Sequence, residues 1–138
     1  MKMLVWDFDN TLAYRDGMWT RTLHHVLNTY GNMRVEESAI RPFLENGFPW
    51  HRHMESHASY FQGLSWWEYL YTVLAPAMAG NGVSDEDVEK LLPLVRETYL
   101  DMRCWHLFAD TIRNLEKAVA SGYTNHILSN HVPELRAI

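Results

Sequence analysis

Hydrophobic and polar residues follow one another in blocks that predict a short strand at each end of the chain and helices between them. An apolar run over residues 3–8 ends in acidic residues, as expected of a buried strand. A second run of this kind covers residues 123–128. Two strands form no stable sheet by themselves, so we expect other partners to complete the sheet.

Between the two runs, apolar residues recur at helical spacing. Ser65 and Glu68 form a predicted capping box, while Thr20 and Ser84 are predicted to cap two further helices. Pro93 is expected to kink or restart its helix. The predicted helices cover residues 20–30, 36–46, 65–75, 84–99 and 108–121.

Composition narrows the functional class. The chain has 138 residues and a net charge of −5 without a basic block, which argues against binding to nucleic acid or to an anionic membrane. Its start does not have the pattern of a signal peptide, and no apolar stretch reaches the roughly 18 residues of a membrane span. A single cysteine, Cys104, favours a reducing compartment. We therefore expect a cytoplasmic protein.

Two carboxylates carry the clearest chemical signal. Asp7 and Asp9 stand two residues apart at the end of the first predicted strand, where ligands bind in α/β sheets. Carboxylates held close together repel and favour a cation between them, and oxygen ligands suit Mg²⁺. An ionised aspartate can also act as a nucleophile, and a second one as a general acid and base. Turn formation at a strand end is the simpler alternative.

Residues 4–12, with the sequence LVWDFDNTL, resemble the first motif of the haloacid dehalogenase superfamily of hydrolases. Residues 127–130, with the sequence ILSN, resemble its second motif, a strand that ends in Ser or Thr. The helical insert between them is similar to the family's helical cap domain. The resemblance implies an α/β fold with a partial Rossmann-like core of parallel sheet. The core covers residues 1–16 and 104–138, and the inserted helical cap covers residues 17–103.

The resemblance implies hydrolysis of a phosphate monoester, with a small phosphorylated metabolite as substrate. Asp7 attacks phosphorus to form an aspartyl-phosphate, and Asp9 protonates the leaving alcohol and then activates water. Mg²⁺ is held by the Asp7 carboxylate and the Asp9 backbone carbonyl. Thr11, Ser129 and Asn130 are the implied substrate-binding residues, with Ser129 donating a hydrogen bond to phosphate. The family's dehalogenases generally lack the second aspartate, so Asp9 favours phosphoryl chemistry.

The family's third and fourth motifs, a basic residue and further acids for Mg²⁺, lie after the second motif. After Ser129 this chain offers only Arg136 as a cation and Glu134 as an acid, too early to be those motifs. We therefore expect a truncated chain, or self-association through the incomplete sheet. Two other functions stay open: a non-catalytic domain that binds phosphate or a partner, and a 2-haloacid dehalogenase.

Histidines and aromatic residues crowd the predicted cap. His53 and His57 have a spacing that suits zinc on a helix, but a packing or surface role for these histidines is favoured. The aromatic residues of this region, which include Trp66 and Trp67, are expected mostly to build the core of the cap rather than to line a substrate pocket.

Overall fold

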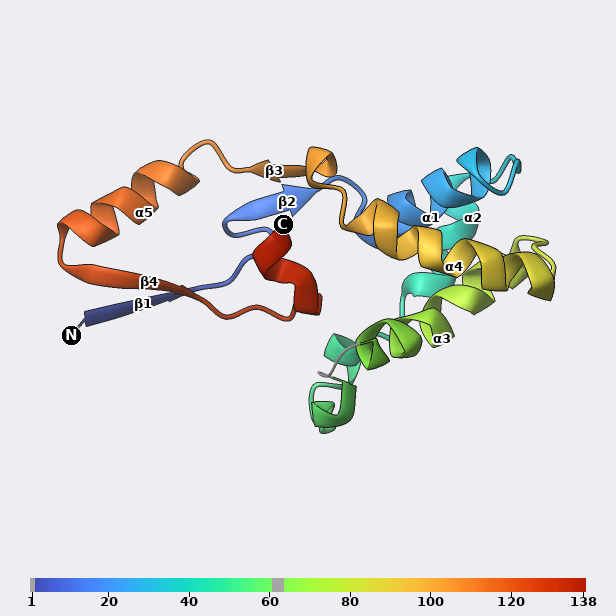
Figure 1. Cartoon of the computed structure of the whole chain (residues 1–138), viewed down its shortest axis with the longest axis horizontal. Coiled ribbons are helices and arrows are strands. Elements are labelled where there is room, and N and C mark those ends of the chain that lie inside the picture. The colour runs from blue at the N-terminus through green and yellow to red at the C-terminus, as the bar shows by residue number, and fades with distance from the viewer. Residues whose placement is uncertain (1, 61–63) are drawn as a thin grey trace. The chain divides into compact units, whose positions relative to one another are not determined.

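The computed structural model describes residues 2–60 and 64–138, and the chain folds as two units (Figure 1). Unit 1 comprises Met1–Asp16, Met102–Arg136 and Ile138, and unit 2 comprises Gly17–Asp101 and Ala137. Unit 2 is thus inserted between the two main segments of unit 1.

Unit 1 is an α/β structure, as predicted. Strands β1 (Lys2–Trp6) and β4 (Tyr123–Ile127) pair in parallel with Lys2 opposite Tyr123 and Trp6 opposite Ile127. Two short strands, β2 (Ala13–Arg15) and β3 (Trp105–Leu107), pair antiparallel where the chain leaves unit 1 and where it returns. Helix α5 (Thr111–Ala120) leads into β4, and a 3₁₀ helix, Pro133–Ala137, lies near the C-terminus (Figure 1).

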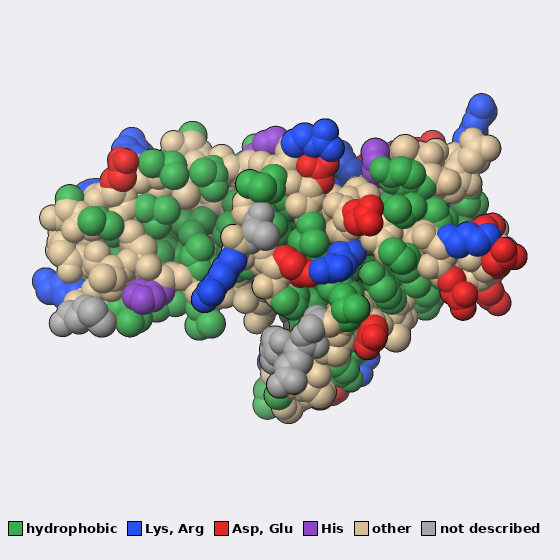
Figure 2. All heavy atoms as spheres, viewed as in Figure 1, with side chains coloured by type: hydrophobic (Ala, Val, Ile, Leu, Met, Phe, Trp, Pro, Cys, Tyr) green, Lys and Arg blue, Asp and Glu red, His purple; other side chains and the backbone are tan. Residues whose placement is uncertain are grey.

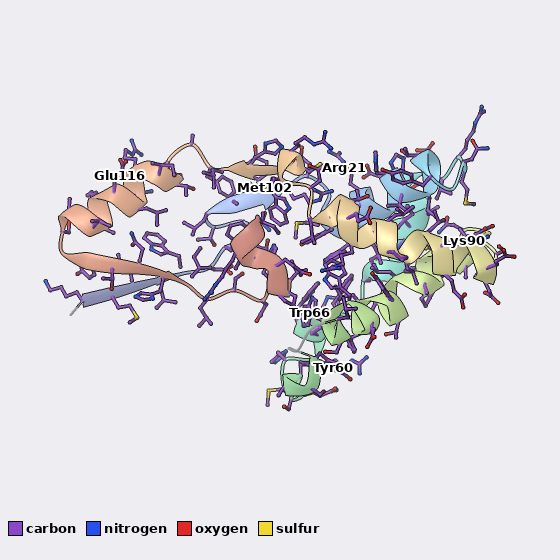
Figure 3. All side chains as sticks on the ribbon, in the orientation of Figure 1. Arg21, Tyr60, Trp66, Lys90, Met102 and Glu116 are labelled. Atoms are coloured by element: carbon purple, nitrogen blue, oxygen red, sulfur yellow. The ribbon has the colours of Figure 1, made fainter. Side chains whose placement is uncertain are left out.

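One face of the parallel pair is joined to α5 by side-chain hydrogen bonds. The indole Nε1 of Trp6 donates to Asn125 Oδ1 at 2.9 Å, and Asn125 Nδ2 donates to the Leu115 carbonyl at 3.0 Å. This chain of bonds ties β1, β4 and α5 together. Glu116 lies on the opposite, outer side of the helix (Figure 3).

The other face of the pair is apolar and open. Met3 and Val5 are 50% and 55% exposed, although their position in a strand predicts burial. Figure 2 shows hydrophobic side chains at the surface of the part of unit 1 that contains β1, β4 and α5. A strand with this pattern normally has both faces covered in a parallel sheet, so the pair is only part of such a sheet.

Unit 2 is helical. It contains α1 (Met18–Thr29), α2 (Glu37–Ile40), α3 (Ser65–Gly80) and α4 (Asp85–Tyr99), with 3₁₀ helices at Arg41–Leu44, Pro49–Arg52 and Ala58–Tyr60. Helices α1, α3 and α4 contact one another through apolar faces. The largest fully buried aliphatic side chains of this core are those of Leu23, Val26, Leu27, Ile40, Leu70, Leu74, Met78 and Val95.

Aromatic rings pack into the same core. The rings of Trp19 and Tyr99 stack with centroids 3.9 Å apart and planes 4° from parallel, and the ring of Phe48 also stacks against Trp19, with centroids 5.7 Å apart. Trp66 and Trp67 are 3% and 1% exposed, which confirms their predicted role in the core. The aromatic content of the insert therefore serves mainly to hold short helices together.

Several local predictions are wrong. Gly17, whose backbone is in the left-handed region at φ 66°, is the residue that precedes α1, so Thr20 lies inside that helix and does not cap it. Ser65 makes no capping bond and instead donates to the Ser59 carbonyl at 3.4 Å. In contrast, Ser84 accepts the predicted capping bond from the Asp87 N–H.

Two prolines that were predicted to end or kink their helices lie inside helices that continue past them. Pro93 lies inside α4, and buried residues precede it (Val88, Leu91) and follow it (Val95, Tyr99). Pro76 likewise lies inside α3. Because the apolar stripe stays in register across each proline, the burial it provides outweighs the lost backbone hydrogen bond.

The first turn of α4 is acidic, and Lys90 lies on the same helix (Figure 3). Figure 2 shows acidic and basic side chains at the surface of unit 2. Lys90 forms ion pairs with Glu86 at 2.7 Å and Asp87 at 3.4 Å. The acidic side chains interact favourably with the helix dipole at the N-terminus, and these ion pairs lie at the surface rather than in a buried site. Over the described ranges, no helix is long and apolar enough to cross a membrane.

Candidate active site

The parallel pairing of β1 and β4 brings two of the predicted site residues together. Asp7 follows β1, Ser129 follows β4, and the Leu128 N–H donates to the Trp6 carbonyl at 2.9 Å, which extends the pairing to the strand ends. Ser129 Oγ then donates to Asp7 Oδ1 at 2.6 Å. The backbone N–H of Phe8 donates to the same oxygen at 2.8 Å. Asp7 thus has one oxygen held by two donors on an exposed side of the sheet edge.

A tight turn follows Asp7. The carbonyl of Phe8 accepts from the N–H groups of Thr11, Leu12 and Ala13 at 3.2, 3.0 and 3.1 Å. Asn10 adopts φ 58°, a left-handed conformation that asparagine tolerates better than most residues. The turn leaves Phe8 buried beneath the site and Asp7 at the surface.

Asp9 lies in a more enclosed setting than Asp7. Its side chain is 23% exposed, and its Oδ1 is buried without a hydrogen-bond partner in the described part of the chain. Burial, and after it the negative charge of Asp7, raises the pKa of Asp9 to about 6. A carboxyl group with such a pKa can both give and take a proton near neutral pH.

His131, which is not among the site residues predicted from the sequence, lies against Asp9. Its side chain is only 1% exposed, and its Nε2 is 3.5 Å from Asp9 Oδ1. The imidazole packs edge-on against Phe8 with centroids 5.1 Å apart and against Trp105 at 5.0 Å. Burial lowers the pKa of His131 to about 4, so the ring is neutral at pH 7. The sequence showed only a histidine two residues after Ser129, which does not reveal burial.

The remaining two predicted residues lie at the surface. Thr11 is exposed on the turn after β1, and Asn130 is exposed after β4. Neither side chain forms a hydrogen bond with the residues that the structure describes. Both lie next to residues of the site in the chain, but no contact in the structure assigns them a role.

The site offers oxygen ligands that suit a hard cation such as Mg²⁺, but fewer than three metal-binding side chains among the described residues. Asp7 and Asp9 both offer oxygen ligands. Burial first, and then the charge of Asp7, raises the Asp9 pKa, and a cation would relieve the second of these causes. Among residues 2–60 and 64–138, no group of three or more His, Cys, Asp or Glu side chains is placed to hold a metal. This result applies equally to the cap histidines His53 and His57. The Asp7 carboxylate and the Asp9 backbone carbonyl are oxygen ligands compatible with Mg²⁺, which usually keeps several waters and binds through one or two carboxylates.

Comparison with solved structures shows a fold shared with a phosphatase-like protein. The chain is similar to the crystal structure of a predicted phosphoglycolate phosphatase from Haemophilus somnus, with a TM-score of 0.56 and 14% sequence identity. The alignment covers 97% of this chain and 53% of the other, so this chain spans about half the length of that protein. No family model matches the chain, and no curated protein matches it significantly. The likeness establishes the fold, a partial α/β core with a helical insert.

Proposed function

We propose that the chain carries the nucleophile half of a phosphatase of the haloacid dehalogenase type, which hydrolyses small phosphate monoesters through an aspartyl-phosphate on Asp7. The observation that carries the proposal is the juxtaposition of Asp7 and Ser129 through a 2.6 Å hydrogen bond, with Asp9 two residues further along. The fold likeness to a predicted phosphoglycolate phosphatase supports the phosphatase class and a small phosphorylated metabolite as substrate.

In the proposed reaction, the free oxygen of the Asp7 carboxylate attacks phosphorus while the ester P–O bond breaks. The Phe8 N–H holds the other oxygen of Asp7 and so orients the attack. The Ser129 hydroxyl, which donates to that same oxygen in the free chain, turns its one proton to a phosphate oxygen when the substrate binds. The protonated Asp9 carboxyl gives its proton to the leaving alcohol. Water then attacks the phosphorus of the aspartyl-phosphate, Asp9 takes up the proton from that water, and phosphate leaves with Asp7 restored.

Mg²⁺ is the proposed cofactor, held by the Asp7 carboxylate and the Asp9 backbone carbonyl. When bound, Mg²⁺ would offset the negative charge that gathers on the transferring phosphoryl group. The two acidic side chains themselves position the nucleophile and move the proton. Thr11, Ser129 and Asn130 are the proposed contacts to the phosphate oxygens.

The test is phosphate release from a small monoester, measured on the purified chain with Mg²⁺ and with EDTA. We expect Mg²⁺-dependent release that Asp7→Asn abolishes and that Glu116→Gln, an exposed carboxylate on the outer side of α5, leaves unchanged. Activity that persists in Asp7→Asn contradicts the proposed nucleophile.

A second candidate function is a non-catalytic domain that binds phosphate. One observation favours it: in the described part of the chain, the side chains that bond to or pair with Asp7 and Asp9 are those of Ser129 and His131 and include no Lys or Arg, whereas phosphoryl transfer depends strongly on positive charge. Isothermal titration with inorganic phosphate, set beside the release assay, separates the two functions. Binding without turnover supports the second function, while rapid turnover excludes it. The third alternative, a 2-haloacid dehalogenase, is disfavoured by Asp9, because a halide needs no general acid.

A further inference from the structure

The environment of His131 is apolar on two sides and faces a carboxylate on the third. Its ring lies against Phe8, which belongs to the buried apolar cluster of unit 1, and against Trp105, which is partly buried and packs on that cluster. The Nε2 atom of the ring lies 3.5 Å from Asp9 Oδ1. That distance is at the outer limit of a hydrogen bond, and such contacts often tighten only when substrate is bound.

We propose that His131 is a positioning residue for Asp9: its Nε2–H donates to Asp9 Oδ1, so that Oδ2 is the oxygen that exchanges a proton with the substrate. This inference rests on the proposed function, since it deepens the role assigned to Asp9. It assigns a role to a residue that is not one of the two residues at the strand ends, Asp7 and Ser129.

Two observations support a donor at this place. Asp9 Oδ1 is buried and otherwise has no hydrogen-bond donor in the described part of the chain, and a buried oxygen of this kind gains from any donor in reach. The His131 side chain is 1% exposed and its Nε2 lies 3.5 Å from this oxygen, so the ring nitrogen is close to Asp9 Oδ1 in a setting where solvent competes little.

The proposal predicts a dependence on the leaving group. An alkyl alcohol is a poor leaving group and needs the proton from Asp9, whereas a nitrophenolate leaves readily without it. Loss of the His131 contact should therefore slow hydrolysis of an alkyl monoester far more than that of a nitrophenyl ester. A residue that only packs would change both rates by the same factor.

Three substitutions at His131 separate the contact from the packing. His131→Phe keeps an aromatic ring between Phe8 and Trp105 but has no N–H. His131→Gln places an amide N–H near the position of Nε2, and His131→Asn places one near Nδ1 instead. The Asn variant is the matched control, because it keeps a donor but directs it to the wrong point.

The kinetic experiment measures kcat and KM of these variants on glycerol phosphate and on nitrophenyl phosphate with Mg²⁺. We expect His131→Phe and His131→Asn to lower kcat on glycerol phosphate by about a hundredfold, with nitrophenyl phosphate reduced only a few-fold and both KM values unchanged. His131→Gln should restore most of kcat. Equal losses on both esters, or no rescue by Gln, overturn the proposal.

A second measurement needs no turnover. In long-range ¹H–¹⁵N NMR spectra of the intact chain, we expect His131 as the neutral Nε2–H tautomer, with a slowly exchanging ring proton that Asp9→Ala shifts strongly. An Nδ1–H tautomer, or a ring signal that Asp9→Ala leaves unchanged, overturns the contact. If the chain hydrolyses neither ester, the proposed function fails, and the NMR result still decides whether His131 holds Asp9.

Discussion

Asp9→Asn should stabilise unit 1 at neutral pH and lose that effect in acid. The folded chain raises the pKa of the Asp9 carboxyl from 3.8 to about 6, because the group is buried and faces the charge of Asp7. The folded state therefore binds more protons than the unfolded state between these values. Stability consequently falls as the pH rises through this window, and the loss is complete above it.

The size of the effect follows from the shift. A pKa displaced by about two units corresponds to about 3 kcal/mol at most, and screening by solvent at this partly exposed carboxyl reduces it to about 1–2 kcal/mol. Asparagine carries no charge and escapes the cost. The variant should therefore gain about 1–2 kcal/mol over the native sequence at about pH 7 and almost nothing at about pH 3.5.

The assay is urea unfolding in EDTA at both pH values, followed through the backbone amide NMR signals of β1 and β4. These signals report on unit 1 alone, which matters because the two units need not unfold together. Glu116→Gln controls for the change in net charge. A variant that is less stable than the native sequence at neutral pH, or equally stabilised at both pH values, would refute the reasoning.

Three further results are expected. His131→Phe should become more stable relative to the native sequence as the pH falls from about 6.5 to 4, by on the order of 2 kcal/mol. The reason is that burial disfavours the protonated form of the native ring, so acid destabilises the native chain but not the variant. A difference in urea unfolding that does not change with pH argues against this. Trp19→Ala should cost about 3–5 kcal/mol and remove near-ultraviolet circular dichroism from the stack with Tyr99, whereas the less buried Trp50→Ala should cost less; equal losses would contradict the assigned core. The native chain should self-associate through the open face of β1 and β4, and Val5→Glu should be monomeric in sedimentation velocity; a native monomer at every concentration counts against this interface.

Hydrophobic patterning predicted the strands that build the site. The apolar runs over residues 3–8 and 123–128 correspond to β1 (Lys2–Trp6) and β4 (Tyr123–Ile127). Their length and composition are those of buried strands, so the local pattern was enough. The antiparallel partners β2 and β3 have only three residues each and are held by pairing between distant segments, which no local pattern records.

Helix ends and the inner part of the site were harder to predict. Ser65 has the capping-box pattern, yet its hydroxyl bonds to Ser59, a competing partner that only the tertiary structure supplies. Asp7 and Ser129 could be placed at one sheet edge because parallel strands end together. The burial of His131 between Phe8 and Trp105 depends on how the chain folds back after β4, and sequence spacing does not reveal it.

The most direct test of the account is to trap the covalent intermediate. The chain is mixed with a nitrophenyl monoester and Mg²⁺, quenched with borohydride, and mapped by peptide mass spectrometry. An aspartyl-phosphate would be reduced to homoserine, and the account predicts this change at Asp7, with none at Asp9 and none in the Asp7→Asn variant. Ester hydrolysis with Asp7 unmodified, or reduction at another residue, would contradict the central claim that Asp7 attacks phosphorus.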